Sequence, residues 1–219
     1  MRYEFNSKST NGINQRIYLK NIFQLSPWPR SVLVLSLLFL VPELAQAHPG
    51  MPGHTHGFSN GILHPLTGLD HFCAMFSVGL WAAQRGGRAL WLVPLSFVSL
   101  MMLGGILGIN GAVIPFAEQA IAVSVLVMGI LIAAAKRLPP VYCAAIVALF
   151  AFFHGYAHGA EMPKTASGLD YGIGFIIATA GLHLCGIGTG LLAQRLGSKN
   201  LLRYAGGAIV ACGVYFCLA

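Results

Sequence analysis

Residues 153–161 of the chain read FHGYAHGAE and lie within a long apolar stretch. On a helix with about 3.6 residues per turn, His154, His158 and Glu161 fall at positions i, i+4 and i+7 and share one face. Two imidazoles and a carboxylate suit a borderline divalent cation. Ionisable groups in a membrane helix are costly and normally face the protein interior, where they mark an ion or substrate path. The stretch therefore predicts a metal site on a membrane helix.

The composition predicts an integral membrane protein. Apolar residues make up 56% of it and charged residues only 9%, whereas charged residues are about a quarter of a typical soluble domain. The sequence has no P-loop pattern to hold a nucleotide, which argues against ATP-driven work by this chain alone. The basic residues behind the formal charge of +7 lie in the N-terminal segment and in short loops. This placement is typical of the loops that orient a membrane protein, and it argues against a nucleic-acid partner.

The first 47 residues are organised like a secretory signal peptide. Basic residues precede an apolar run over 32–41, and Ala45, Gln46 and Ala47 form a small-x-small cleavage signal before His48. An uncleaved extra helix is the alternative, but the apolar run is shorter than the ~20 residues that span a bilayer. We therefore divide the chain into a signal peptide (1–47), a histidine-containing periplasmic tail (48–59) and a transmembrane domain (60–219).

The tail contains three histidines, His48, His54 and His56, among prolines and glycines. Because Pro and Gly disfavour regular structure, the tail is either a flexible metal-gathering segment or a disordered spacer.

Apolar stretches after the leader predict an all-α membrane protein with six transmembrane helices. Lys and Arg fall mainly in the loops that would be cytoplasmic if the mature N-terminus is periplasmic, in agreement with the positive-inside rule. We therefore expect a multi-pass protein of the bacterial inner membrane. The predicted spans are 60–83, 89–110, 112–135, 140–160, 170–193 and 201–218.

Pairs of glycines within these spans predict close helix contacts, because small residues let helices approach where lipid supplies no hydrophobic drive. The pairs are Gly104 with Gly108, Gly186 with Gly190, and Gly206 with Gly207.

The first predicted span carries HPLTGLDH over residues 64–71. His64 and His71 are seven residues apart and share a face of a continuous helix, while Asp70 points about 120° away. Asp70 either reaches a bound ion from the side or orients a histidine by accepting a hydrogen bond from it. Gly68 removes a side chain one turn from His64 and leaves room for an ion.

The histidines and acidic residues of the spans all fall in the predicted outer half, which indicates a cavity that is open to the outside and narrows around a cation site. Glu118 is either a variable ligand or proton acceptor, or a carboxylate that is favoured at a helix start by the dipole. His183 either lines the path or forms a hydrogen bond with a neighbouring helix.

The two histidine motifs match the sequence patterns of a known protein family. HPLTGLDH fits the pattern HPxxGxDH and FHGYAHGAE fits FHGxAHGxE, so the chain resembles the HupE/UreJ family of nickel or cobalt permeases over essentially its whole mature length. The resemblance implies a signal peptide, six helices, transport of nickel or cobalt, and an indirect supply of a nickel or cobalt metalloenzyme. It also implies functional roles for His64, Asp70, His71, His154, His158 and Glu161.

Together these observations predict secondary or channel-like uptake of Ni²⁺ or Co²⁺ across the inner membrane, without enzymatic chemistry and with no cofactor besides the transported ion. Imidazole and carboxylate ligands do not choose between the two metals, and the sequence leaves open whether the chain forms a homo-oligomer. An intramembrane zinc-dependent hydrolase is the alternative. A bis-histidine haem protein is a second rival, although histidines one turn apart suit a small ion better.

Overall fold

Five of the predicted membrane spans form helices long and apolar enough to cross a bilayer in the computed structural model, which describes residues 57–162, 167–197 and 199–219. These residues belong to one unit, Pro49–Ala219. The predicted signal peptide and the tail histidines His48, His54 and His56 lie outside the described residues. The five helices are α5 (Ala89–Ile109), α6 (Ala117–Ala134), α7 (Pro140–Glu161), α8 (Gly168–Arg195) and α9 (Lys199–Leu218).

The first predicted span, 60–83, is two helices instead of one. Helix α3 covers Gly57–Thr67 and α4 covers Leu69–Arg85. The break falls at Gly68, whose backbone is extended at φ −76° and ψ 113°. The expectation that His64 and His71 share the face of a continuous helix is therefore wrong, and their proximity arises across this break.

The third predicted span begins later than expected, at Ala117 instead of residue 112. Residue Ile114 precedes a proline, and the proline ring disfavours helical backbone in the residue before it. The loop is held by Tyr156 of α7, whose hydroxyl accepts from the Ile114 amide at 2.9 Å and donates to the Ala112 carbonyl at 2.9 Å. Glu118 consequently lies in the first turn of α6.

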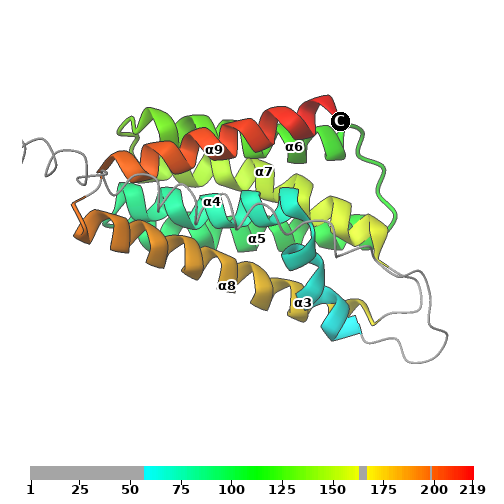
Figure 1. The fold of residues 1–219 in the computed structure, drawn as a ribbon. Coiled ribbons are helices and arrows are strands. Elements are labelled where there is room, and N and C mark those ends of the chain that lie inside the picture. Colours follow the sequence, from blue (N-terminus) through cyan, green and yellow to red (C-terminus); the bar gives the residue numbers. More distant parts are fainter. Residues whose placement is uncertain (1–56, 163–166, 198) are drawn as a thin grey trace, which may run out of the picture. The chain divides into compact units, whose positions relative to one another are not determined.

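The described helices pack as two pairs and a group of three (Figure 1): α5 lies along α7, α6 lies along α9, and α3 and α4 both pack against α8. Helix α4 joins these sets, because it also contacts α5, α6 and α9. Helix α4 is buried on nearly all sides, for example at Met75, Leu80 and Trp81, each at most 1% exposed. Residues on α4 therefore face the interior of the bundle, which is where ionisable groups of a membrane helix belong.

Glycines bring the paired helices into backbone contact. A methyl group at Gly155 of α7 would overlap the Met101 carbonyl of α5, and one at Gly186 of α8 would overlap the Phe76 carbonyl of α4. The predicted close contacts are confirmed at Gly104, Gly108, Gly186, Gly190 and Gly206. The prediction is wrong for Gly207, where an added methyl group would meet nothing within 4 Å.

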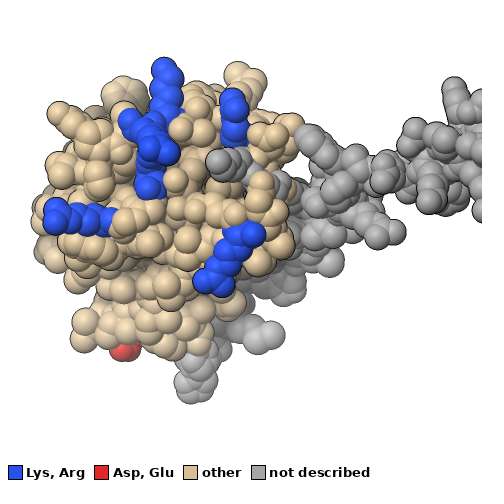
Figure 2. Space-filling view, turned by 90° about the vertical axis from the view of Figure 1, so that its left-hand side faces the viewer, with Lys and Arg blue, Asp and Glu red and all other residues tan. Residues whose placement is uncertain are grey.

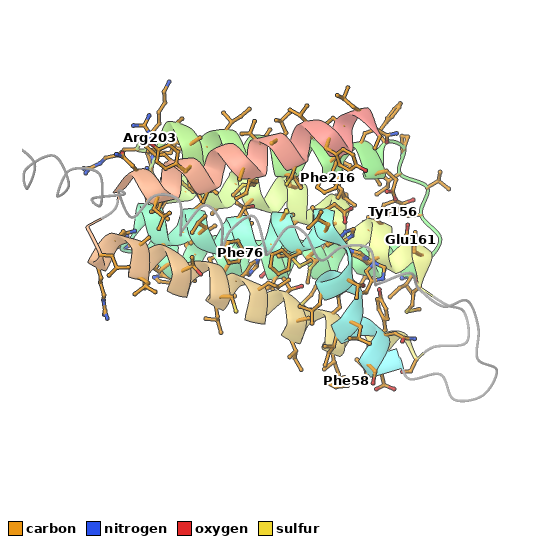
Figure 3. The ribbon with its side chains drawn as sticks, viewed as in Figure 1. Phe58, Phe76, Tyr156, Glu161, Arg203 and Phe216 are labelled. Carbon is orange, nitrogen blue, oxygen red and sulfur yellow. The ribbon has the colours of Figure 1, made fainter. Side chains whose placement is uncertain are left out.

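The two ends of the bundle differ in charge. One end, here the basic end, carries Arg85, Arg88, Lys136, Arg137, Arg195 and Arg203, and Figure 2 shows Lys and Arg side chains spread over it. Figure 3 places Arg203 there and Glu161 at the opposite end, here the histidine end. Side chains at the basic end also form hydrogen bonds with the backbone at the ends of neighbouring helices. For example, Gln194 Nε2 of α8 donates to the Ala83 carbonyl of α4 at 2.8 Å. The helix ends at this face are therefore tied to one another.

The close contact of α4 with α8 predicts opposite effects for two substitutions on one helix. Gly186→Ala should destabilise the protein by about 1–3 kcal/mol, because the new methyl group meets backbone that cannot yield easily. Gly188→Ala should be neutral or stabilising by up to about 1 kcal/mol, since a methyl group there meets nothing within 4 Å and alanine favours a helix. Thermal unfolding of the detergent-solubilised variants measures both. Equal Tm values would contradict the packing described here.

Candidate metal centre

Three imidazoles converge at the histidine end of the bundle. His64 of α3, His71 of α4 and His158 of α7 each offer a ring nitrogen, and these atoms all lie within 4.8 Å of one another. The ring centroid of His158 is 4.6 Å from that of His64 and 4.3 Å from that of His71. We call these residues the three-histidine cluster. A cation between them could contact all three rings, since imidazole nitrogen is a common ligand of divalent transition metals.

Asp70 contacts His71 directly. Its Oδ1 accepts from the His71 backbone amide at 2.8 Å and lies 2.5 Å from Nδ1 of the same ring. This contact corresponds to the second of the two arrangements predicted for Asp70, in which the carboxylate orients a histidine. A carboxylate on one ring nitrogen fixes the tautomer and leaves the other nitrogen free to bind a metal. In His71 the free atom is Nε2.

The His158 side chain is 3% exposed, and neither of its ring nitrogens has a hydrogen-bond partner among the described residues. The ring of Phe175 from α8 lies 4.3 Å away. A buried polar group without a partner costs about 1–3 kcal/mol. The packing therefore holds an imidazole at a free-energy cost, and neither nitrogen is occupied by a hydrogen bond with the described residues.

His154 lies one turn deeper than His158 and does not belong to the three-histidine cluster. Its side chain is fully buried, and its ring centroid is 5.6 Å from that of His71. Nδ1 lies 3.1 Å from the Phe150 carbonyl, whereas Nε2 has no partner among the described residues. His154 thus presents one free nitrogen to the interior next to the cluster.

The two glutamates lie apart from the cluster. Glu161 and Glu118 are exposed, and their carboxyl groups lie within reach of each other, with Tyr171 beside Glu161. Figure 3 shows Glu161 at the tip of α7, beyond Tyr156. The predicted common face of α7 therefore divides in two: both histidines point into the bundle, and the carboxylate remains near the surface with Glu118.

His183 lies near the middle of α8, deeper than any of the other predicted residues. Its side chain is 2% exposed, neither ring nitrogen has a partner in the described part of the chain, and its ring stands edge-on to Phe97 at 5.0 Å. The imidazole therefore forms no hydrogen bond with a neighbouring helix among the described residues, and the second of its two predicted roles has no contact to support it.

Sequence reasoning missed the aromatic residues around these histidines. Phe175 packs on His158, Tyr171 lies 6.4 Å from His64, and Phe97 lies 5.8 Å from His154, between ring centroids. A cavity of about 300 Å³, lined by α5, α7 and α8, reaches His158 from the side. Its walls are otherwise largely apolar. No signal in the sequence distinguishes these aromatics from ordinary apolar residues of a span.

The described residues form helices and loops only, several of the helices could cross a bilayer, and a histidine cluster lies inside one end of the bundle. The chain is therefore a multi-pass membrane protein. The family model described as HupE / UreJ protein matches residues 35–216, and the chain therefore belongs to the HupE/UreJ family. Among curated relatives, Protein HupE of Rhizobium leguminosarum bv. viciae is 42% identical over 173 residues, covering 79% of this chain and 90% of that protein. No solved structure matches the chain.

Proposed function

We propose that this protein is a permease that admits Ni²⁺ or Co²⁺ through the bacterial inner membrane, and that the transported ion binds at the three-histidine cluster. The observation that carries the proposal is the convergence of three imidazole nitrogens within 4.8 Å from three different helices. Membership of the HupE/UreJ family supports metal transport in general, and it gives no support to the alternative of a zinc-dependent hydrolase.

The ligand set suits transport better than permanent binding. A closed tetrahedral site with four protein ligands traps its metal, whereas three protein ligands leave a position for water. Asp70 orients His71 through its 2.5 Å contact, and His154 offers its free Nε2 as the next ligand inward. Exchange of one ligand for another lets the ion advance without being fully stripped.

The exposed glutamates extend the path outward. Glu161 and Glu118 place two carboxylates at the histidine end, where they attract a hydrated cation before it meets the imidazoles. In this proposal the histidine end faces the periplasm and the basic end faces the cytoplasm, in keeping with the positive-inside rule. Residues 1–47 act as a signal peptide, and the tail histidines His48, His54 and His56 gather metal.

The membrane potential is a sufficient energy source. An inward-negative potential gives a divalent cation about 4.6 kcal/mol per 100 mV, twice the value for a single charge, which corresponds to roughly a thousandfold accumulation. Secondary or channel-like uptake therefore needs no nucleotide, and the imported metal becomes available to a nickel or cobalt metalloenzyme.

Uptake of radioactive nickel and cobalt tests the proposal, in cells that lack other importers. His158→Ala should lower uptake at least about tenfold, because it removes one of three ligands and leaves a smaller, dry side chain. The control is Leu149→Ala on the same helix, where the leucine is 60% exposed and faces away from the cluster. If the wild type imports neither ion, or His158→Ala imports as the wild type does, the proposal is wrong.

Asp70→Asn tests the orienting role of the carboxylate. The amide keeps the size of the side chain but can no longer hold Nδ1 of His71 as an anion, so affinity for nickel should fall about 10–100-fold. The matched control is Asp170→Asn in the second GLD sequence of the chain, at the exposed start of α8. Titration of the purified variants with NiCl₂ measures both affinities. An unchanged affinity in Asp70→Asn would remove the residue from the site.

Uptake should fall as the pH on the histidine side drops. Imidazole binds metal only when neutral, and its ordinary pKa is about 6.5, so protons displace the ion below that pH and do not compete above it. We expect at least about a tenfold loss of uptake between pH 7.5 and 5.5. Proteoliposomes at a clamped potential give the measurement, since the driving force then stays constant. A flat profile would argue against imidazole ligands.

A further inference from the structure

His183 is a buried base that the proposed site does not use. It is 2% exposed and both ring nitrogens lack a partner among the described residues. A leucine would fill the same apolar surroundings without the cost of about 1–3 kcal/mol for an unpaired buried polar group. An unpaired group of this kind in a native interior calls for a functional explanation.

One helical turn toward the histidine end, Thr179 lies on the same face of α8 as His183. Its hydroxyl donates to the thioether sulfur of Met75 on α4 at 3.3 Å and lies 3.8 Å from that of Met101 on α5. All three side chains are buried, with exposed fractions of 0% to 3%. Three helices therefore bring two thioethers and a hydroxyl to one point inside the bundle.

His183 belongs to the adjacent layer of the same interior. Gly79, one turn after Met75 on α4, lies in backbone contact with His183. Phe97, one turn before Met101 on α5, places its ring 5.0 Å from the imidazole of His183. The same two helices thus flank both layers. On its other side, the Phe97 ring centroid lies 5.8 Å from that of His154. His154 therefore connects this layer with the three-histidine cluster.

We propose that Met75, Met101, Thr179 and His183 form a second, inner station for the transported cation, near the middle of the membrane. This inference rests on the proposed transport function and extends it to residues outside both sequence motifs. Thioether sulfur and imidazole nitrogen bind late transition metals and do not bind Mg²⁺ or Ca²⁺, which require oxygen ligands. Rotation of the Thr179 hydroxyl releases the sulfurs and turns an oxygen lone pair to the ion.

The inner station adds a second selectivity step to the proposed ion path. Carboxylates near the histidine end attract any divalent cation, but only an ion that accepts soft donors is stabilised in a layer that contains two thioethers. The inner station therefore rejects Mg²⁺ even if that ion reaches the outer carboxylates. Selectivity by ligand softness needs no covalent step and no co-reactant.

The experiment replaces sulfur without changing volume. Met75→Leu with Met101→Leu keeps the core filled, since leucine and methionine exchange at a cost below about 1.5 kcal/mol. The control is Met102→Leu, next to Met101 in sequence but 48% exposed. We expect nickel uptake at least tenfold lower in the double variant and in His183→Ala, with unchanged uptake in the control. Nickel binding at the three-histidine cluster, titrated with NiCl₂, should remain as in the wild type.

X-ray absorption at the nickel edge detects the atoms bound to the metal. It therefore distinguishes metal binding by Met75 and Met101 from a purely structural role of these residues. The wild type with excess NiCl₂ should show sulfur neighbours of the metal, and the double variant should not. Wild-type uptake and sulfur signal in the double variant would overturn the inner station and leave the proposed function intact. Absence of nickel and cobalt uptake by the wild type would instead overturn the proposed function. If His183→Ala does not accumulate in the membrane, the double variant alone decides.

Discussion

The candidate site depends on the backbone contact between α5 and α7. In FHGYAHGAE each histidine is followed by a glycine, so the glycine face of α7 is turned about 100° from the histidine face. Gly155 and Gly159 abut the carbonyls of Met101 and Gly105 on α5. The histidine face is turned away from this contact, and His154 and His158 lie beside His71 of α4. One short sequence therefore specifies both the helix contact and the direction of the ligands.

The break at Gly68 is the second constraint. A straight helix through 57–85 could not place α3 against the outer part of α8 and α4 in the centre of the bundle, as the chain requires. The break also sets Asp70 in the first turn of α4, where a carboxylate is favoured by the helix dipole. Interrupted helices with their ends at an ion site are a recurrent device of secondary transporters. Here the interruption lets His64 and His71 meet His158.

The polar and sulfur-containing side chains change in type from the histidine end of the bundle toward its middle. Exposed carboxylates lie at the histidine end, followed by three imidazoles, by His154, and then by thioethers and His183. The oxygen donors of the two glutamates are therefore outermost, and nitrogen and sulfur donors, most of them buried, lie behind them. On the path that we propose, an ion would exchange water for protein ligands in steps, so that no single step carries the full cost of dehydration.

The sequence by itself determined the helical class and five of the span positions, and it offered candidate ligand residues in both motifs, because hydropathy and residue chemistry are local properties. It also indicated the close helix contacts at most of the predicted glycines. Only the tertiary structure decided that the first span breaks at Gly68, that His64 joins His71 and His158 while Glu161 stays outside with Glu118, and that Thr179 contacts Met75 and Met101. Such contacts join residues up to about a hundred positions apart. They depend on how helices cross, which a pattern read along one helix cannot contain.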